Sequence, residues 1–110
     1  MKMAMKMAKL NKVDVVIAHA PGTKLGDTSE LQAIENVCGK IPVFSTKHAT
    51  GHTYGASAGL SLIAAKMCLE KQSLPKIPYL DLPNLKKIDT VMVNAIGFGA
   101  NAISIILSKV

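Results

Sequence analysis

The chain has 110 residues, 49% of them hydrophobic and only 4% aromatic, which predicts a single domain over residues 1–110 with an aliphatic core. Its net charge of +6 comes from 13 lysines without any arginine, the residue best suited to reading bases and gripping phosphates, so we expect an acidic protein partner and no nucleic acid. No apolar run approaches the roughly 18 residues of a membrane span, and the opening MKMAMKMAKL lacks the features of a signal peptide, so we expect a cytoplasmic protein that does not bind membranes.

Apolar periodicity predicts alternating helices and strands in the first part of the chain. Strong helix formers favour a helix over residues 2–9, and a β-branched run predicts a buried parallel strand over residues 13–18. Asp27 as N-cap, with Glu30 three residues later in a capping box, predicts a helix that ends at Gly39.

The second part begins with a predicted strand over residues 41–45. A longer helix is expected over residues 50–72, capped by Thr50, and the small residues in its first turns indicate a buried, central position. Two β-rich runs, at residues 90–96 and 102–109, are joined tightly enough to form an antiparallel pair.

The order α-β-α-β-α-β-β predicts a layered α/β fold with a mixed sheet. In such sheets, ligands gather at the carboxyl ends of the strands. His19 follows the first strand, Lys47 and His52 follow the second, and the Gly-Phe-Gly run at 97–99 follows the third. We therefore expect these three loops to converge at one edge of the sheet.

The histidines are candidates for stabilising a developing oxyanion. His52 is expected in the first turn of the helix capped by Thr50, where the helix dipole disfavours imidazolium and lowers the pKa. A neutral imidazole there can donate a hydrogen bond to an oxyanion, and His19 at its strand end could do the same. Lys47 has apolar flanks, and a buried lysine needs a partner or a chemical purpose.

Zinc binding is the main alternative, because His48 and His52 are four residues apart and one helix face could present both. The stretch HATGH lacks the glutamate of HExxH, and Gly51 weakens the helical turn, so we expect no metal site. Cys38 and Cys68 lie singly without CxxC spacing, which indicates buried free thiols in a reducing compartment.

The stretches VDVVIAHAPGTKLGDTSE, STKHATGHTYGASAG and NAIGFGANA carry a resemblance to a known family. They are similar, in the same order and with similar spacing, to motifs of the β-ketoacyl-acyl-carrier-protein synthases, the elongating type II members of the thiolase superfamily. The resemblance implies a thiolase-like C-terminal half. It also implies that the nucleophilic cysteine belongs to an N-terminal half that these 110 residues do not contain.

The resemblance implies a role for individual residues. His19 and His52 would be the two catalytic histidines, which promote decarboxylation of a malonyl thioester and hold its enolate oxygen. Lys47 would set the electrostatics around them, and Phe98 would be an aromatic gate beside the nucleophile. The phosphopantetheine-binding and substrate-binding positions would be Thr23, Gly97 and Gly99, whereas His48 matches no catalytic position.

Three positions depart from the family pattern. Pro21 stands where the family has a first threonine that contacts pantetheine, and Ile96 replaces an aromatic residue. Ser61 occupies the place of the glutamate that partners the lysine. Without that partner, the charge of Lys47 would be less compensated, which favours its neutral form.

The function implied by the resemblance is decarboxylative Claisen condensation of malonyl carrier protein with an acyl thioester, in fatty-acid or polyketide-type biosynthesis. The expected partners are acyl carrier protein, the N-terminal half of the synthase and further copies of the chain. The phosphopantetheine arm would carry the substrate, without a permanently bound cofactor. This chain alone would be inactive. The alternatives are a non-catalytic partner subunit like a chain-length factor, and an α/β interaction domain without enzymatic activity.

Overall fold

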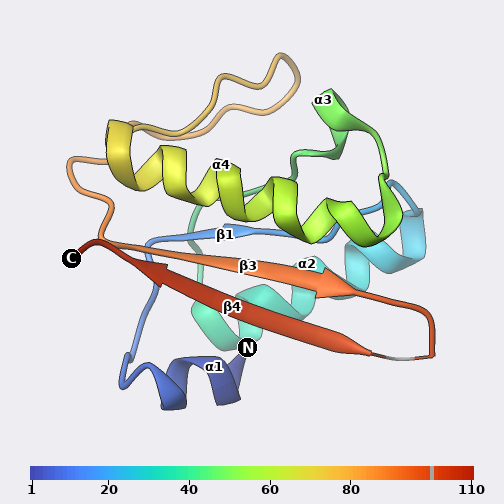
Figure 1. Cartoon of the computed structure of the whole chain (residues 1–110), viewed down its shortest axis with the longest axis horizontal. Helices are drawn as coiled ribbons and strands as arrows, with labels where there is room; N and C mark the ends of the chain where they lie inside the picture. Colours follow the sequence, from blue (N-terminus) through green and yellow to red (C-terminus); the bar gives the residue numbers. More distant parts are fainter. Residues whose placement is uncertain (100) are drawn as a thin grey trace.

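The computed structural model describes residues 1–99 and 101–110, and its strands form one mixed sheet (Figure 1). The sheet has the order β2-β1-β3-β4, with bounds Val43–Phe44, Val15–Ile17, Thr90–Ile96 and Ala102–Ser108. β1 is parallel to both β2 and β3, whereas β3 and β4 are antiparallel over their whole lengths. The predicted mixed sheet and C-terminal hairpin are thus confirmed.

Helices cover both faces of the sheet (Figure 1). One face packs against α4 (Ser57–Lys71), and the other packs against α1 (Lys2–Met7) and α2 (Lys24–Cys38). Because successive strand residues point to opposite faces, β1 sends Val15 and Ile17 into the first core and Val16 into the second. All three of these side chains are fully buried, which explains the continuous β-branched run.

The predicted start of α2 is wrong. The helix begins at Lys24, with Thr23 at the N-cap, so Asp27 lies in its first turn rather than before it. Glu30 is therefore not part of a capping box; it is buried and bonds to another segment. The predicted end is confirmed, because Gly39 caps the helix with a φ of 77° that a side chain would disfavour.

The helix predicted over residues 50–72 is interrupted at its start. It consists of α3 (Lys47–Thr50), a single 3-10 turn η1 (Tyr54–Ala56) and then α4. Gly51 leaves α3 with a φ of 70°, so Thr50 ends one helix rather than capping another. α4 is also less buried than expected, because only one of its faces packs on the sheet.

Other boundaries differ slightly from prediction. α1 ends before residue 9 because Lys9 adopts a left-handed conformation. β1 and β2 are shorter than predicted, since only residues 15–17 and 43–44 pair as strand. No helix in the described parts of the chain is long and apolar enough to cross a membrane.

One end of the sheet is closed by a single aspartate. Asp14 accepts hydrogen bonds from the backbone N–H groups of Asp89 and Thr90, both at 2.9 Å, and from the Thr90 hydroxyl at 3.0 Å. These bonds join the start of β1 to the start of β3. Gln72 makes a similar tie from the end of α4, because its side-chain amide donates to and accepts from the backbone of Ile88. We call this the closed end.

Candidate functional site

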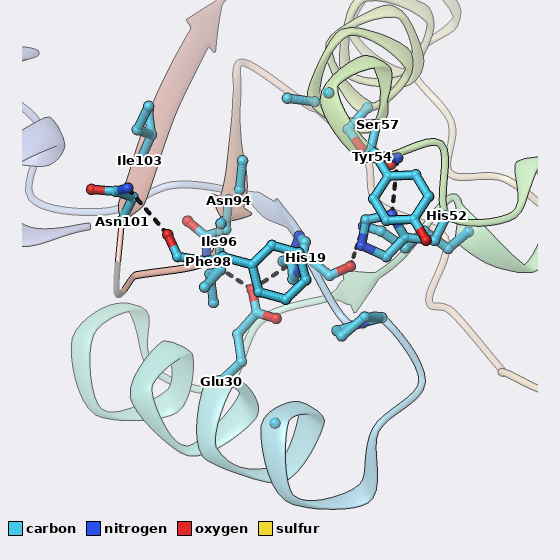
Figure 2. A pocket seen from close by; sticks show the side chains of 18 of the residues that line it. His19, Glu30, His52, Tyr54, Ser57, Asn94, Ile96, Phe98, Asn101 and Ile103 are labelled. Atoms are coloured by element: carbon cyan, nitrogen blue, oxygen red, sulfur yellow. Dashed lines mark hydrogen bonds between the residues drawn. The ribbon is translucent and has the colours of Figure 1, made fainter.

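The opposite end of the sheet holds a cavity of about 840 Å³ (Figure 2). It lies beyond the carboxyl ends of β1 and β3 and beside the first turns of α4. Its wall includes, among other residues, His19, Thr23, Glu30, Lys47, His52, Tyr54, Ser61, Asn94, Gly97, Phe98 and Asn101. The three loops that were expected to converge do so here.

Glu30 fixes the backbone of the loop after β1. Its two carboxylate oxygens accept the N–H groups of His19 and Ala20, each at 2.8 Å. Asn94 of β3 donates to the same carboxylate at 3.4 Å, and Ser104 of β4 donates to the Asn94 side-chain oxygen at 2.8 Å. The carboxylate therefore ties the His19 loop to the C-terminal hairpin.

His52 lies in an irregular segment between α3 and η1, so the predicted helix-dipole effect on it is wrong. Its Nδ1 accepts the backbone N–H of Tyr54 at 3.0 Å. An acceptor nitrogen carries no proton, so in the neutral ring the proton sits on Nε2, which becomes a hydrogen-bond donor. The ring is also packed against the Tyr54 ring, with centroids 5.1 Å apart.

The side chains of His19 and His52 are neighbours in the wall of the cavity (Figure 2). Their ring centroids are 5.5 Å apart and the rings are nearly perpendicular. Burial lowers the pKa of His19, the positive charge of Lys47 lowers it further, and Glu30 opposes both effects. His19 is therefore kept neutral at lower pH than an ordinary histidine.

Lys47 is partly buried at the start of α3, and its Nζ donates a hydrogen bond to the backbone carbonyl of His19. Burial lowers the pKa of Lys47, while the charges of Glu30 and Asp27 act in the opposite direction. Ser61 is buried within the same wall, but its hydroxyl pairs with that of Thr46 at 3.2 Å.

The remaining predicted residues lie around the rim. The Phe98 side chain is 92% exposed. The side-chain amide of Asn101 donates a hydrogen bond to the backbone carbonyl of Phe98 at 3.2 Å. Gly97 donates its N–H to the Asn101 carbonyl at 2.8 Å, whereas Gly99, with a φ of 78°, does not line the cavity. Thr23 is exposed at the lip. Ala100, between Gly99 and Asn101 in the sequence of this Gly-rich turn, lies outside the described residues.

His48 and the two cysteines lie away from the cavity. The His48 ring bonds to the Ser45 carbonyl at 2.9 Å and packs against Tyr79, so it does not share a face with His52. Burial raises the pKa of both Cys38 and Cys68, which makes their thiols poor nucleophiles. Within residues 1–99 and 101–110, no group of three or more His, Cys, Asp or Glu side chains could hold a metal ion.

Sequence reasoning missed Glu30, Asn94 and Asn101 as members of the site. Glu30 was interpreted as half of a capping box because that pattern is local, and its true partners are ten or eleven residues away. A glutamate on the apolar face of a helix, next to Ile34, was the available signal.

Residues 1–81 match the family described as "Beta-ketoacyl synthase, C-terminal domain". The chain is 32% identical to a 3-oxoacyl-[acyl-carrier-protein] synthase 2 of Coxiella burnetii over 90% of its length, and 32% identical to one of Rhizobium meliloti over 99%. It spans only 28% and 30% of those proteins. A solved structure titled "The ishigamide ketosynthase/chain length factor" superposes with a TM-score of 0.84 at 26% identity, covering 99% of this chain and 31% of that one.

Proposed function

Because the chain belongs to the β-ketoacyl synthase family, as its C-terminal domain, we propose that it is the C-terminal part of a 3-oxoacyl-[acyl-carrier-protein] synthase. The whole enzyme would condense malonyl carrier protein with an acyl thioester. The observation that carries this proposal is the pair of facing imidazoles, His19 and His52, beside the Lys47 amine in one cavity.

The geometry suits stabilisation of an enolate. When a malonyl thioester loses carbon dioxide, the electron pair of the broken C–C bond becomes an enolate whose charge rests on the thioester oxygen. The Nε2–H of His52 and one ring N–H of neutral His19 would donate hydrogen bonds to that oxygen. The His52 ring is oriented before the reaction by the Tyr54 N–H, and Glu30 fixes the backbone from which the His19 ring projects, so little reorganisation of these two segments is needed.

The carbanion would then attack the acyl carbonyl carried on a cysteine. A new C–C bond forms, the C–S bond breaks, and the cysteine leaves as a thiolate. Neither Cys38 nor Cys68 lines the cavity, which supports a nucleophile supplied by an N-terminal half. Lys47 would add positive charge beside the reacting carbonyl and help to keep His19 neutral.

An N-terminal half and further copies of the chain would cover the apolar side chains exposed around the cavity and on α4. These include Phe98, Ile103 and Ile105 at the hairpin and Ile63 and Met67 on the helix, which are 40% to 92% exposed. Exposed apolar surface of this kind is typical of a protein interface.

Acyl carrier protein would deliver both substrates. Its phosphopantetheine arm would pass Thr23 and the Gly97–Gly99 turn, with Phe98 as the gate. Carrier proteins are acidic and this chain carries a net charge of +6, so we expect their encounter to weaken as the salt concentration rises.

A matched pair of histidine variants tests the proposal in an enzyme assembled from this chain and an N-terminal synthase half that supplies the cysteine. His52→Ala should abolish malonyl decarboxylation and leave acyl transfer to the cysteine measurable, because transfer does not form the enolate. His48→Ala, four residues away but outside the cavity, should leave both steps unchanged. Decarboxylation by the His52 variant at the parental rate would refute the role given to that residue.

A second candidate function is that of a non-catalytic partner subunit, favoured by the similarity to a ketosynthase/chain length factor structure. The two histidines and the lysine in one cavity favour the catalytic alternative. If the assembled enzyme were inactive with both histidines intact, the partner-subunit function would be supported instead.

A further inference from the structure

Lys47 is partly buried and lacks the ion pair that two surface lysines of the chain have. Lys66 pairs with Glu70 at 3.0 Å and Lys87 pairs with Asp89 at 2.8 Å, both at the surface. Lys47 makes no ion pair with any residue that the structure describes, although it is more buried than either. Its charge is desolvated without a carboxylate in contact.

The two nearby acids are already engaged. The oxygens of Glu30 accept the backbone N–H groups of His19 and Ala20, and Asp27 accepts the N–H of Gly22 at 3.2 Å. Ser61, across the wall, offers only a hydroxyl, which is paired with Thr46. The free-amine form of Lys47 is therefore more accessible than that of a surface lysine, since burial lowers its pKa.

The position of the amine also suits attack on a carbonyl. Its Nζ donates to the His19 carbonyl oxygen and so lies beside the loop that holds one of the two facing imidazoles. A neutral amine has two N–H bonds and one lone pair, so it can donate to that oxygen and keep its lone pair for attack on a carbonyl. A thioester whose oxygen is held by His19 and His52 would bring its carbonyl carbon close to this lone pair.

We propose that Lys47 is a covalent acceptor of acyl groups from thioesters bound in the cavity. The amine attacks the thioester carbonyl, a C–N bond forms, the C–S bond breaks, and the proton lost by the amine goes to the departing thiolate. The products are an N-acyl-lysine and a free thiol, so no oxidant, metal or further reactant is required. The inference rests on the proposed function in one respect, namely that the histidines hold the thioester oxygen.

Acylation would change the charge inside the cavity. The positive charge of Lys47 lowers the pKa of His19, and an amide carries no charge, so the modification raises that pKa. The other charged groups that act on His19 are unaffected, with Glu30 and Asp27 raising its pKa and His52 lowering it. The N-acylated protein would thus protonate His19 more readily and lose a neutral donor.

The test uses the 110-residue chain and S-acetylpantetheine, with acetylation of each lysine followed over time by peptide mass spectrometry. Lys47 should be acetylated several-fold faster than Lys66 and Lys87, which serve as internal references. His52→Ala should slow the reaction at Lys47, and His48→Ala should not. Acetylation of Lys47 no faster than that of the two reference lysines would overturn the proposal.

Two further arms separate this inference from the proposed function. In a histidine titration followed by NMR, Lys47→Gln should raise the pKa of His19 and Lys47→Arg should not; equal titration curves would overturn the electrostatic link. If the assembled enzyme decarboxylates malonyl thioester while Lys47 stays unmodified, this inference fails alone. If Lys47 is acetylated in a His52-dependent way while decarboxylation is absent, the proposed condensation fails and this inference stands.

Discussion

The two ends of the sheet differ in structure: one is joined by hydrogen bonds and the other borders a cavity. At the closed end, one carboxylate, Asp14, accepts three hydrogen bonds from Asp89 and Thr90 and joins the two central strands. At the other end, a cavity of about 840 Å³ lies beyond the carboxyl ends of β1 and β3, where His52 is exposed and Phe98 is 92% exposed. The difference indicates that the closed end carries stability, so that the open end can present chemically useful side chains.

The largest expected effect comes from removing the carboxylate of the closed end. Asp14→Ala leaves the N–H groups of Asp89 and Thr90 without their acceptor, and should lower the free energy of unfolding by on the order of 2 kcal/mol. His52→Ala at the open end should cost less than about 1 kcal/mol, because it removes one exposed hydrogen bond. Urea unfolding of both variants measures the difference. Equal losses in the free energy of unfolding would contradict the inference that the closed end carries more of the stability than the open end.

Acid should act on the two ends in different pH windows. The pKa of His19 is lowered from 6.5, so folding favours its neutral form and stability falls as the pH drops from 6.5 through the lower folded value. Burial alone would raise the pKa of Asp14, but its hydrogen bonds to Asp89 and Thr90 more than offset this and lower it from 3.8. The stability contributed by Asp14 is therefore present above that value and is lost as the pH falls through the folded pKa.

Two variants assign these windows by unfolding free energy measured against pH. His19→Gln should flatten the profile only in the window below pH 6.5, and Asp14→Asn only in the window below pH 3.8. A single variant that removed both slopes would show that the two ends titrate as one unit.

A smaller effect is expected at Tyr54, whose φ of 49° is unusual for an aromatic residue. Asparagine tolerates this conformation and keeps the N–H that bonds to His52, so Tyr54→Asn should change stability by less than about 1 kcal/mol. Tyr54→Val should be worse than Tyr54→Asn, because a β-branched side chain disfavours positive φ. Thermal unfolding ranks the two, and the reverse order would exclude backbone strain as the dominant factor.

The smallest effect on stability is expected at the gate. Phe98→Ser removes a side chain that is 92% exposed and should alter the free energy of unfolding by less than about 0.5 kcal/mol. The same change should reduce self-association, which light scattering at several concentrations detects, because exposed apolar side chains promote pairing. Unchanged association would locate the self-contact elsewhere, for example on the exposed face of α4.

The sequence predicted the sheet better than the site, for physical reasons that particular residues illustrate. Residues 90–96 were correctly predicted as a strand because the first four residues, all buried, form a continuous run of apolar and β-branched side chains. The convergence of His19, Lys47 and His52 followed from topology, because parallel strands end at one edge. The strand was predicted from a local sequence pattern, and the convergence of the loops was predicted from a topology that α/β folds share.

The segment from Thr50 to Tyr54 could not be predicted in the same way. Its composition is compatible with a helix, but Gly51 takes a positive φ and the Tyr54 N–H bonds to a side chain instead of a carbonyl one turn back. Glu30 was misassigned for a related reason, since its carboxylate oxygens accept the N–H groups of His19 and Ala20, a tertiary contact that outweighs a local cap. The hydrogen bonds that shape the site, such as those from the Tyr54 N–H to His52 and from the His19 N–H to Glu30, do not follow the local patterns by which helices and caps are predicted.

The position of β1 between β2 and β3 has a consequence for how the protein is made. The bonds from Asp14 to Thr90 join residues 76 positions apart, so most of the chain must leave the ribosome before β1 gains its second neighbour. Until then β1, whose three residues are wholly buried in the finished fold, has an unpaired apolar edge. An unpaired apolar edge of this kind favours aggregation, so we expect nascent chains in that state to depend on chaperones that shield strand edges during synthesis.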